Sequence, residues 1–215
     1  MKIIAISDIH GYLPELDPCD VVCISGDIIP LEIQKDIFQS WWWFNNTFRK
    51  WTNKLDCEKV IIIGGNHDFF LEGEEPFEME KVVYLRDSDY EYEGIKFWGS
   101  PWITGLPYWA FNVSEQEQEK LFNLIPNNID ILLTHTPPFD IQDIARVDWQ
   151  QGNPIDYGSK ALTKIIPLKN PRYVLSGHIH SGNHERIEFN KSILYNVSLK
   201  DETYDVSYNP VIIHA

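Results

Sequence analysis

The chain has 215 residues, which suits one globular domain over residues 1–215 better than two independent cores. Its hydrophobic content of 43% and charged content of 23% exclude wholesale disorder and low-complexity or collagen-like character. Lys and Arg total 18 against 32 Asp and Glu, and the formal net charge of -14 argues against tight general binding to nucleic acids.

The amino-terminal stretch MKIIAISDIHG has too short an apolar run for a signal peptide, because Asp8 and His10 interrupt it. No other segment approaches the roughly 20 apolar residues that span a bilayer. We therefore expect a cytoplasmic protein without a membrane partner. Cys19, Cys23 and Cys57 lack the spacing of a zinc ribbon, so we expect reduced thiols in or near the core.

Short runs of β-branched and aliphatic residues predict buried strands. In chain order these runs are Ile3 to Ile6, Val21 to Ile24, Val60 to Ile63, Val82 to Leu85, Ile131 to Leu133 and Tyr173 to Leu175. All but the fourth lead directly into a polar or glycine-containing segment: SDIHG, SGDI, GGNHD, THTPP and SGHIH. Ligands bind beyond the carboxyl ends of strands in open α/β sheets, so these five loops are expected to share one site.

Two helices are predicted between the strands. The first is an amphipathic stripe whose members recur at steps of 4, 3, 4 and 3: Ile37, Trp41, Phe44, Phe48 and Trp51. At least one ring of the run Trp41, Trp42 and Trp43 lies off this stripe, and we favour core packing for it over contact with a partner. Ser114 and Glu117 have the spacing of a capping box, which predicts a helix over 115–125.

The last third of the chain is predicted to be richer in strands. Residues 185–199 indicate a hairpin around Asn190 and Lys191, and Val211 to Ile213 indicate a last strand. The segment from Pro137 to Gly158 is the longest predicted loop, and long ordered loops are often functional.

Five of the seven histidines lie in the strand-exit segments: His10, His67, His135, His178 and His180. They alternate with Asp8, Asp27 and Asn66, and imidazole and carboxylate are the usual ligands of first-row divalent metals. In extended backbone, residues two apart project to the same side, so Asp8 with His10 and His178 with His180 can each converge on one ion. Each motif alone is weak, but their order at the ends of apolar runs predicts a shared metal site.

These motifs resemble those of the calcineurin-like metallophosphoesterase superfamily over residues 1 to about 200. The matching segments are Asp8-Ile9-His10, Gly26-Asp27, Gly65-Asn66-His67-Asp68, Thr134-His135 and Gly177-His178-Ile179-His180. Within the superfamily, the chain looks most like the metallophosphoesterase-domain-containing branch, whose animal members are brain-associated phosphodiesterases. Three segments carry this closer likeness: Gly99 to Trp102, Thr134 to Pro138 and Gly177 to His180.

The resemblance implies an α/β fold, a sandwich of two β-sheets flanked by helices, with a dinuclear centre at the sheet edge. It implies that one ion takes Asp8, His10 and His180. The other would take Asn66, His135 and His178, with Asp27 bridging both ions. His67 is then the non-ligand histidine near the leaving group. All of these residues are present, which disfavours a metal-free relative.

One departure from the family pattern narrows the expected activity. Phosphoprotein phosphatases of the superfamily continue the GD motif as GDxxDRG and use an aspartate there as the partner of their catalytic histidine. Here Gly26 and Asp27 are followed by IIPLE, so protein phosphatase activity is not expected. Asp68 either orients His67 or caps a helix or loop, and we favour capping.

The leading hypothesis is a phosphodiesterase in which a metal-bridging hydroxide attacks phosphorus and His67 donates a proton to the leaving oxygen. The expected cofactors are two divalent ions, each Mn, Fe, Zn or Ni, and the expected substrate is a cyclic nucleotide or nucleotide-like ester. Asn66, His67, Trp102 and Phe139 are candidate substrate contacts, and Tyr12, Phe69 and Phe70 are further candidates for the cavity wall.

Three other hypotheses stay open. The first is a phosphomonoesterase, and the second is a nuclease, which the acidic charge disfavours. The third, from another class, is a non-catalytic scaffold that binds partners through its Trp-rich surface. Oligomeric state is left open.

Overall fold

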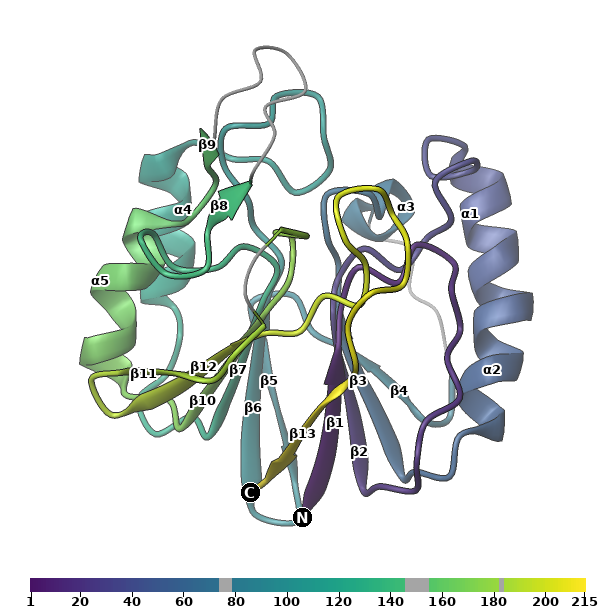
Figure 1. The fold of residues 1–215 in the computed structure, drawn as a ribbon, viewed down its shortest axis with the longest axis horizontal. Helices are drawn as coiled ribbons and strands as arrows, with labels where there is room; N and C mark the ends of the chain where they lie inside the picture. Colours follow the sequence, from purple (N-terminus) through teal and green to yellow (C-terminus); the bar gives the residue numbers. More distant parts are fainter. Residues whose placement is uncertain (74–78, 146–154, 182–183) are drawn as a thin grey trace.

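Two β-sheets pack face to face at the centre of the structure, and helices cover their outer faces (Figure 1). The computed structural model describes residues 1–73, 79–145, 155–181 and 184–215. The predicted α/β sandwich of two sheets flanked by helices is therefore confirmed. No helix among these described residues is long and apolar enough to cross a bilayer.

The first sheet has the strand order β13-β1-β2-β3-β4. Its strands are β1 (Lys2–Ile6), β2 (Val21–Ser25), β3 (Lys59–Ile63), β4 (Val82–Tyr84) and β13 (Val211–His214). Neighbours are parallel except at the edge, where β13 runs antiparallel to β1. The carboxyl ends of β1, β2 and β3 therefore lie together at the same end of this sheet.

The second sheet has the order β11-β12-β10-β7-β6-β5. Its strands are β5 (Ser88–Tyr92), β6 (Ile95–Ser100), β7 (Ile131–Thr134), β10 (Tyr173–Ser176), β11 (Ile187–Phe189) and β12 (Ser192–Asn196). The hairpin β11-β12 confirms the predicted turn at Asn190. The hairpin β5-β6 was not predicted, although Glu93 and Gly94 form its two-residue turn with φ of 47° and 80°.

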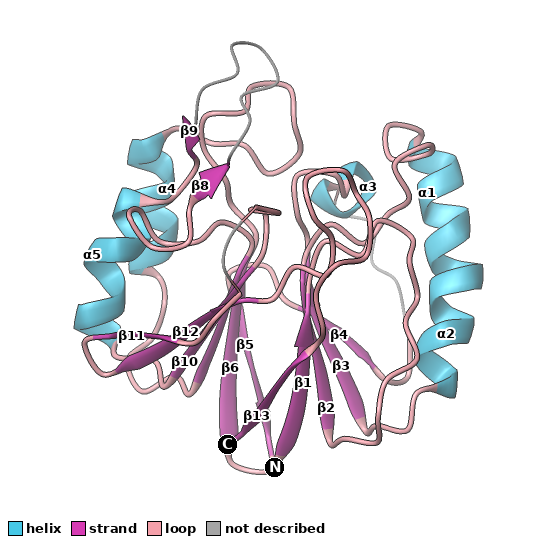
Figure 2. Cartoon of the chain, in the orientation of Figure 1, coloured by secondary structure: helices cyan, strands magenta, loops and turns pink. Residues whose placement is uncertain are grey.

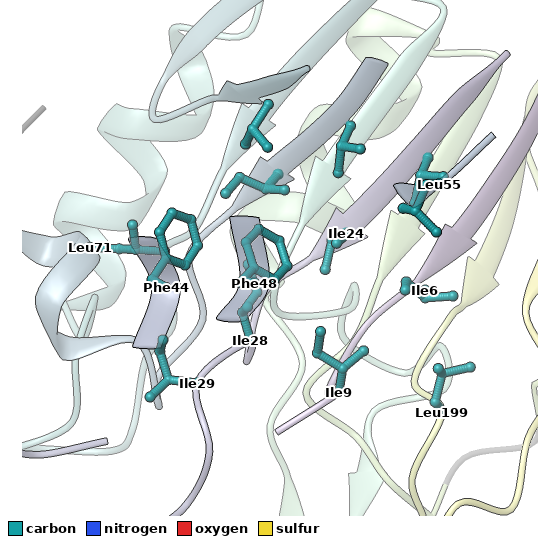
Figure 3. Close-up of a cluster of buried hydrophobic side chains, with 14 of the residues drawn as sticks. Ile6, Ile9, Ile24, Ile28, Ile29, Phe44, Phe48, Leu55, Leu71 and Leu199 are labelled. Atoms are coloured by element: carbon teal, nitrogen blue, oxygen red, sulfur yellow. The ribbon is translucent and has the colours of Figure 1, made fainter. Parts of the chain in front are cut away.

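Each central strand is apolar on both faces because each face meets a different layer. In β1, Ile3 belongs to the core between the two sheets, whereas Ile4 and Ile6 belong to the core beneath the helices on the outer face of the first sheet. Figure 3 shows this second core, in which Ile6 and Ile24 lie in the same cluster as Phe44 and Phe48. This layering explains why the strand sequences are continuously apolar rather than alternately apolar and polar.

The predicted helix at 37–51 is a helical segment in three parts. It consists of α1 (Ile37–Trp43), the π-helical turn η1 (Phe44–Phe48) and α2 (Arg49–Lys54). Phe44 and Phe48 are fully buried as predicted, but Ile37 is 54% exposed and Trp41 is 43% exposed. The single apolar stripe is therefore wrong at its start. The buried positions are Ser40, Phe44, Phe48 and Thr52, and the wider π-helical turn keeps this spacing of four residues on one face.

The tryptophan run does not pack wholly in the core. Trp43 contacts the buried cluster, whereas Trp41 and Trp42 are both exposed. Core packing was the expected role for a ring off the stripe, and this expectation is wrong for Trp42. The three free cysteines lie where they were expected, with Cys23 and Cys57 buried and Cys19 half-buried.

The outer face of the second sheet is covered by α4 (Glu115–Asn123) and α5 (Lys160–Lys169). The predicted cap of α4 is confirmed, because Oγ of Ser114 accepts a hydrogen bond from the Glu117 amide at 3.2 Å. The predicted loop from Pro137 to Gly158 contains two short paired strands, β8 (Ile144–Ala145) and β9 (Ile155–Asp156), and its residues 146–154 lie outside the described part of the chain. The short helix α3 (Phe69–Glu72) follows the GNHD segment.

Candidate metal centre

The five strand-exit loops meet at one end of the sandwich, where Figure 2 shows loops above the carboxyl ends of the strands. The loops after β1, β2 and β3 come from the first sheet, and those after β7 and β10 come from the second. Six of the candidate side chains are buried: Asp8, His10, Asp27, Asn66, His67 and His135. His178 and His180 are half-buried. Folding thus brings together every residue that was predicted to bind metal.

Asp8, His10 and His180 form the first group of donors, with ligand atoms all within 4.8 Å of one another. Nε2 of His180 lies 3.2 Å from Oδ1 of Asp8. The other ring nitrogen of His180, Nδ1, pairs with the carbonyl oxygen of Asp201 at 3.0 Å. This outer hydrogen bond turns Nε2 toward the centre, as is common for histidine ligands of metals.

His135 and Asn66 form the core of the second group. Nδ1 of His135 pairs with the carbonyl oxygen of Ser25 at 2.8 Å, and its Nε2 lies 2.9 Å from Oδ1 of Asn66. The ring of His178 lies beside that of His135, with centroids 5.0 Å apart. These three residues are the ones that the family resemblance implies for the second ion.

Asp27 lies between the two groups. Its Oδ2 is 3.4 Å from Nε2 of His135 and 3.8 Å from Nε2 of His10. Its Oδ1 accepts a hydrogen bond from the His67 amide at 2.8 Å. One buried carboxylate therefore faces histidines of both groups, which is the position that a bridging ligand requires.

Three buried nitrogen atoms at this site have no hydrogen-bond partner within the described residues: Nδ1 and Nε2 of His10 and Nε2 of His178. Leaving a buried polar group unpaired costs about 1–3 kcal/mol. Burial lowers the pKa of both imidazoles to about 3, and the neutral ring is the form that binds metal. The residues present therefore fit divalent ions.

The charged members of the site respond to one another. Burial alone would lower the pKa of His135, but the Asp27 carboxylate outweighs it and raises this pKa to about 9. Burial alone would raise the pKa of Asp27 and Asp8, but neighbouring histidines hold both well below the usual range. Two carboxylates thus remain ionised, which is the state that a cation requires.

The backbone at the site is strained. Asp8, His10, Asp27 and His178 all have left-handed φ, at 54°, 41°, 55° and 69°. Such conformations are uncommon for residues other than glycine and cluster at functional sites. Two motif glycines are required for space, because a Cβ on Gly65 would collide with Asp27 and a Cβ on Gly177 with Asp8.

Asp68 braces the loops and does not contact the imidazole of His67. Its carboxylate accepts hydrogen bonds from the amides of Ile28, Ile29 and Gly65 at 2.9, 3.0 and 2.9 Å. It makes no side-chain capping bond to α3. The favoured interpretation of Asp68 as a residue that caps a helix or a loop is confirmed for the loops, whereas Asp68 does not cap the helix through its side chain.

A cavity of about 1320 Å³ opens over the site. Among the described residues that line it, Phe139 is present and Trp102 is not. Instead, Trp102 donates its indole N–H to Asp87 at 2.6 Å and packs edge-on against Phe111. Tyr12, Phe69 and Phe70 are likewise not among these described lining residues.

Four other aromatic residues of the described chain line the cavity and were not predicted, and three of them contact candidate site histidines: Trp109, Tyr157 and Tyr204. Trp109 lies against His67 with ring centroids 4.5 Å apart, and Tyr157 lies against His178 at 5.7 Å. Tyr204 contacts both His10 and His180 at 5.1 Å. None of the three belongs to a strand-exit motif. Tyr157 lies in the long predicted loop from Pro137 to Gly158, whereas the sequence offered no signal for Trp109 and Tyr204 beyond residue type.

Comparisons with known proteins agree with this geometry. The family model for calcineurin-like phosphoesterases matches residues 1–182. The UPF0046 protein T07D4.2 of Caenorhabditis elegans is 28% identical over 99% of this chain, and metallophosphoesterase domain-containing protein 1 of Homo sapiens is 27% identical over 84% of it. The chain spans 59% and 61% of the lengths of these two relatives. The expected likeness to metallophosphoesterase-domain-containing proteins is confirmed.

A solved structure gives the same picture of the fold. The crystal structure of TT1561 of Thermus thermophilus has a TM-score of 0.61 and 16% identity. The match covers 93% of this chain and 89% of that one. At this level of identity the likeness concerns the fold alone.

Proposed function

Because the chain belongs to the calcineurin-like phosphoesterase family, we propose that it is a metal-dependent phosphodiesterase that acts on a small, nucleotide-like ester such as a cyclic nucleotide. The observation that carries this proposal is the convergence of the donor side chains on a buried site where imidazole nitrogens have no partner among the described residues. Structural histidines normally find a hydrogen-bond partner when buried, so these are better explained as ligands.

We assign two ions to the site. Asp8, His10 and His180 would hold one, Asn66, His135 and His178 would hold the other, and Asp27 would contact both. Paired divalent ions, of which manganese is our first choice, supply positive charge for the phosphoryl oxygens and a water-derived nucleophile at neutral pH. With only two carboxylates among the ligands, the formal charge of the loaded site is about +2, so an acidic protein can still attract a phosphoester here.

His67 is placed to donate a proton. Its Nε2 lies 3.8 Å from Oδ2 of Asp27, so it faces the donor groups without belonging to either implied ligand set. It also lines the cavity, where an ester would enter. A leaving alkoxide or phenoxide needs a proton as its bond to phosphorus breaks, and a positioned imidazole supplies it.

The cavity wall favours an ester with a single negative charge. Its described lining includes the carboxylates Glu115, Asp156 and Glu202 against one ammonium, that of Lys160. A diester carries one charge at phosphorus, whereas a monoester carries close to two and is repelled more by these groups. The aromatic rings of Trp109 and Tyr204 offer flat surfaces for a base. Long nucleic acids are disfavoured because the chain has a net charge of -14.

A rate panel tests this function. The purified protein with added manganese is assayed on bis(p-nitrophenyl) phosphate, p-nitrophenyl phosphate and cyclic nucleotides. We expect the diesters to be hydrolysed faster than the monoester, and all activity to disappear with a chelator. Faster hydrolysis of the monoester would identify a phosphomonoesterase. No hydrolysis and no bound metal would favour the non-catalytic scaffold.

A further inference from the structure

His67 has a neutral hydrogen-bond partner. Its Nδ1 pairs with Oε1 of Gln34, a half-buried side chain in the turn before α1. The GD motif of this chain lacks the aspartate that phosphoprotein phosphatases use as the partner of their catalytic histidine. Asp68 does not replace it, because the carboxylate of Asp68 accepts three backbone amides instead. Among the described residues, Gln34 is therefore the side chain that pairs with Nδ1 of His67.

We propose that Gln34 is the positioning residue of His67, whose Nδ1–H it accepts so that Nε2 faces the phosphoester. The proposal rests on the proposed function, in which His67 protonates the leaving group. It adds a residue that no strand-exit motif contains.

The backbone that carries Gln34 is held on both sides. The Ile33 amide donates to the carbonyl of Pro30 at 3.2 Å, and the Ile33 carbonyl accepts from the Asp36 amide and from Oγ of Ser40, each at 2.8 Å. Asp36 in turn caps α1 by accepting from the Gln39 amide at 3.0 Å. The side-chain amide of Gln34 therefore extends from a turn whose backbone is fixed, as a positioning group requires.

The imidazole of His67 is also fixed on its other sides. Trp109 packs on it with centroids 4.5 Å apart, and the ring of His10 meets it edge-on at 4.7 Å. The His67 amide donates to Asp27 at 2.8 Å. Of the two ring nitrogens, only Nε2 then remains to exchange a proton with an ester at the centre.

The proton transfer balances with this arrangement. The imidazolium holds one proton on each ring nitrogen. As the bond from phosphorus to the leaving oxygen breaks, the N–H bond at Nε2 breaks and an O–H bond forms on that oxygen. The ring is left neutral, with Nδ1–H still donated to Gln34, and water later returns a proton to Nε2. A carboxylate at position 34 could accept the same hydrogen bond, but an aliphatic side chain could not.

The kinetic test compares leaving groups in the manganese-loaded protein. We expect Gln34→Leu to lower kcat about 10- to 100-fold on diphenyl phosphate and less than about threefold on bis(p-nitrophenyl) phosphate, whose leaving group needs no acid. Gln34→Glu should restore most of the loss, and the surface control Gln116→Leu should change neither rate. In a His67→Ala background, Gln34→Leu should have no further effect. Equal losses on both esters, or a further loss in that background, would overturn the proposal.

A second readout does not depend on turnover. In the zinc-loaded protein, imidazole ¹⁵N NMR should show a proton on Nδ1 of His67 in the wild type and in Gln34→Glu, and a loss of that preference in Gln34→Leu. Normal hydrolysis with an unprotonated Nδ1 in the wild type would overturn the role of Gln34 alone. Absence of hydrolysis by the wild type would overturn the proposed function and, with it, proton donation through this pair.

Discussion

Oδ2 of Asp27 lies 3.4 Å from Nε2 of His135, and this contact joins the two sheets of the sandwich. Asp27 follows β2 of the first sheet, whereas His135 follows β7 of the second. The site therefore forms only when the two sheets pack against each other in this arrangement. The buried core between the sheets, which includes Cys23 of β2 and Leu133 of β7, holds them in this arrangement.

The charge of Asp27 should be needed to retain metal. We predict that Asp27→Asn lowers the bound metal from about two ions per chain to one or fewer, because an amide supplies no negative charge between the ions. Elemental analysis of protein purified without chelator measures this. The exposed control Asp17→Asn should bind as the wild type does, and full occupancy in Asp27→Asn with normal turnover would contradict the assignment.

The acid role of His67 predicts a dependence on the leaving group. His67→Ala should keep both metals but slow diphenyl phosphate about 100- to 10,000-fold, while bis(p-nitrophenyl) phosphate is slowed far less. Steady-state rates on the two esters, with His214→Ala as an exposed control, provide the measurement. Equal losses on both esters would remove His67 from proton transfer.

Metal affinity should rise with pH. In the metal-free protein His135 keeps its proton up to a pKa of about 9, because Asp27 attracts it, and a metal must displace that proton. Lowering the pH below 9 therefore weakens binding. His180 adds to this dependence, because burial alone would lower its pKa but the neighbouring Asp8 carboxylate outweighs burial and raises this pKa as well. His10 and His178 add no dependence near neutrality, since burial lowers the pKa of each to about 3.

Calorimetric titration with zinc in buffers of different ionisation enthalpy tests this dependence. We predict tighter binding at pH 8 than at pH 6.5, with on the order of one proton released per chain at pH 7. An affinity that is constant over this range would show that His135 is already neutral in the metal-free protein.

The glycine at position 65 should be required for space. Gly65→Ala places a methyl group against Oδ1 and the amide of Asp27, so we predict a loss of about 1–3 kcal/mol in the free energy of unfolding. Urea unfolding of chelator-treated protein measures it. Gly73→Ala is the matched control, because its Cβ would make only an ordinary contact at 3.4 Å. Equal midpoints for the two variants would refute this steric account.

The sequence was sufficient for most of the strands, though not for the hairpin β5-β6 or the pair β8-β9, and for the convergence of the candidate donors. The strands that begin near Ile3 and Val21 could be recognised because side chains on both of their faces are buried, which makes the runs continuously apolar. The polar residues that follow these runs converge because the carboxyl ends of parallel strands lie at the same end of a sheet. The order of DxH, GD, GNHD, TH and GHxH then placed the donors without any knowledge of loop conformation.

Residues that reach the site through tertiary contacts could not be predicted. The ring of Tyr204 contacts that of His10. Tyr204 lies in a turn that Asp201 stabilises, because its carboxylate accepts hydrogen bonds from the hydroxyls of Thr203 and Ser207 at 2.7 and 2.6 Å. Gln34 reaches His67 from a turn whose sequence carries no motif. Trp102 was assigned to the cavity by its closeness in sequence to a motif, but its indole N–H is bound to Asp87 in the structure.

Anomalous diffraction from crystals grown with manganese tests the central assignment most directly. We predict two peaks about 3.5–4 Å apart. One should lie among Asp8, His10 and His180, and the other among Asn66, His135 and His178, with Asp27 between them. No peak at these residues in a fully manganese-supplemented crystal, or a single peak elsewhere, would contradict it.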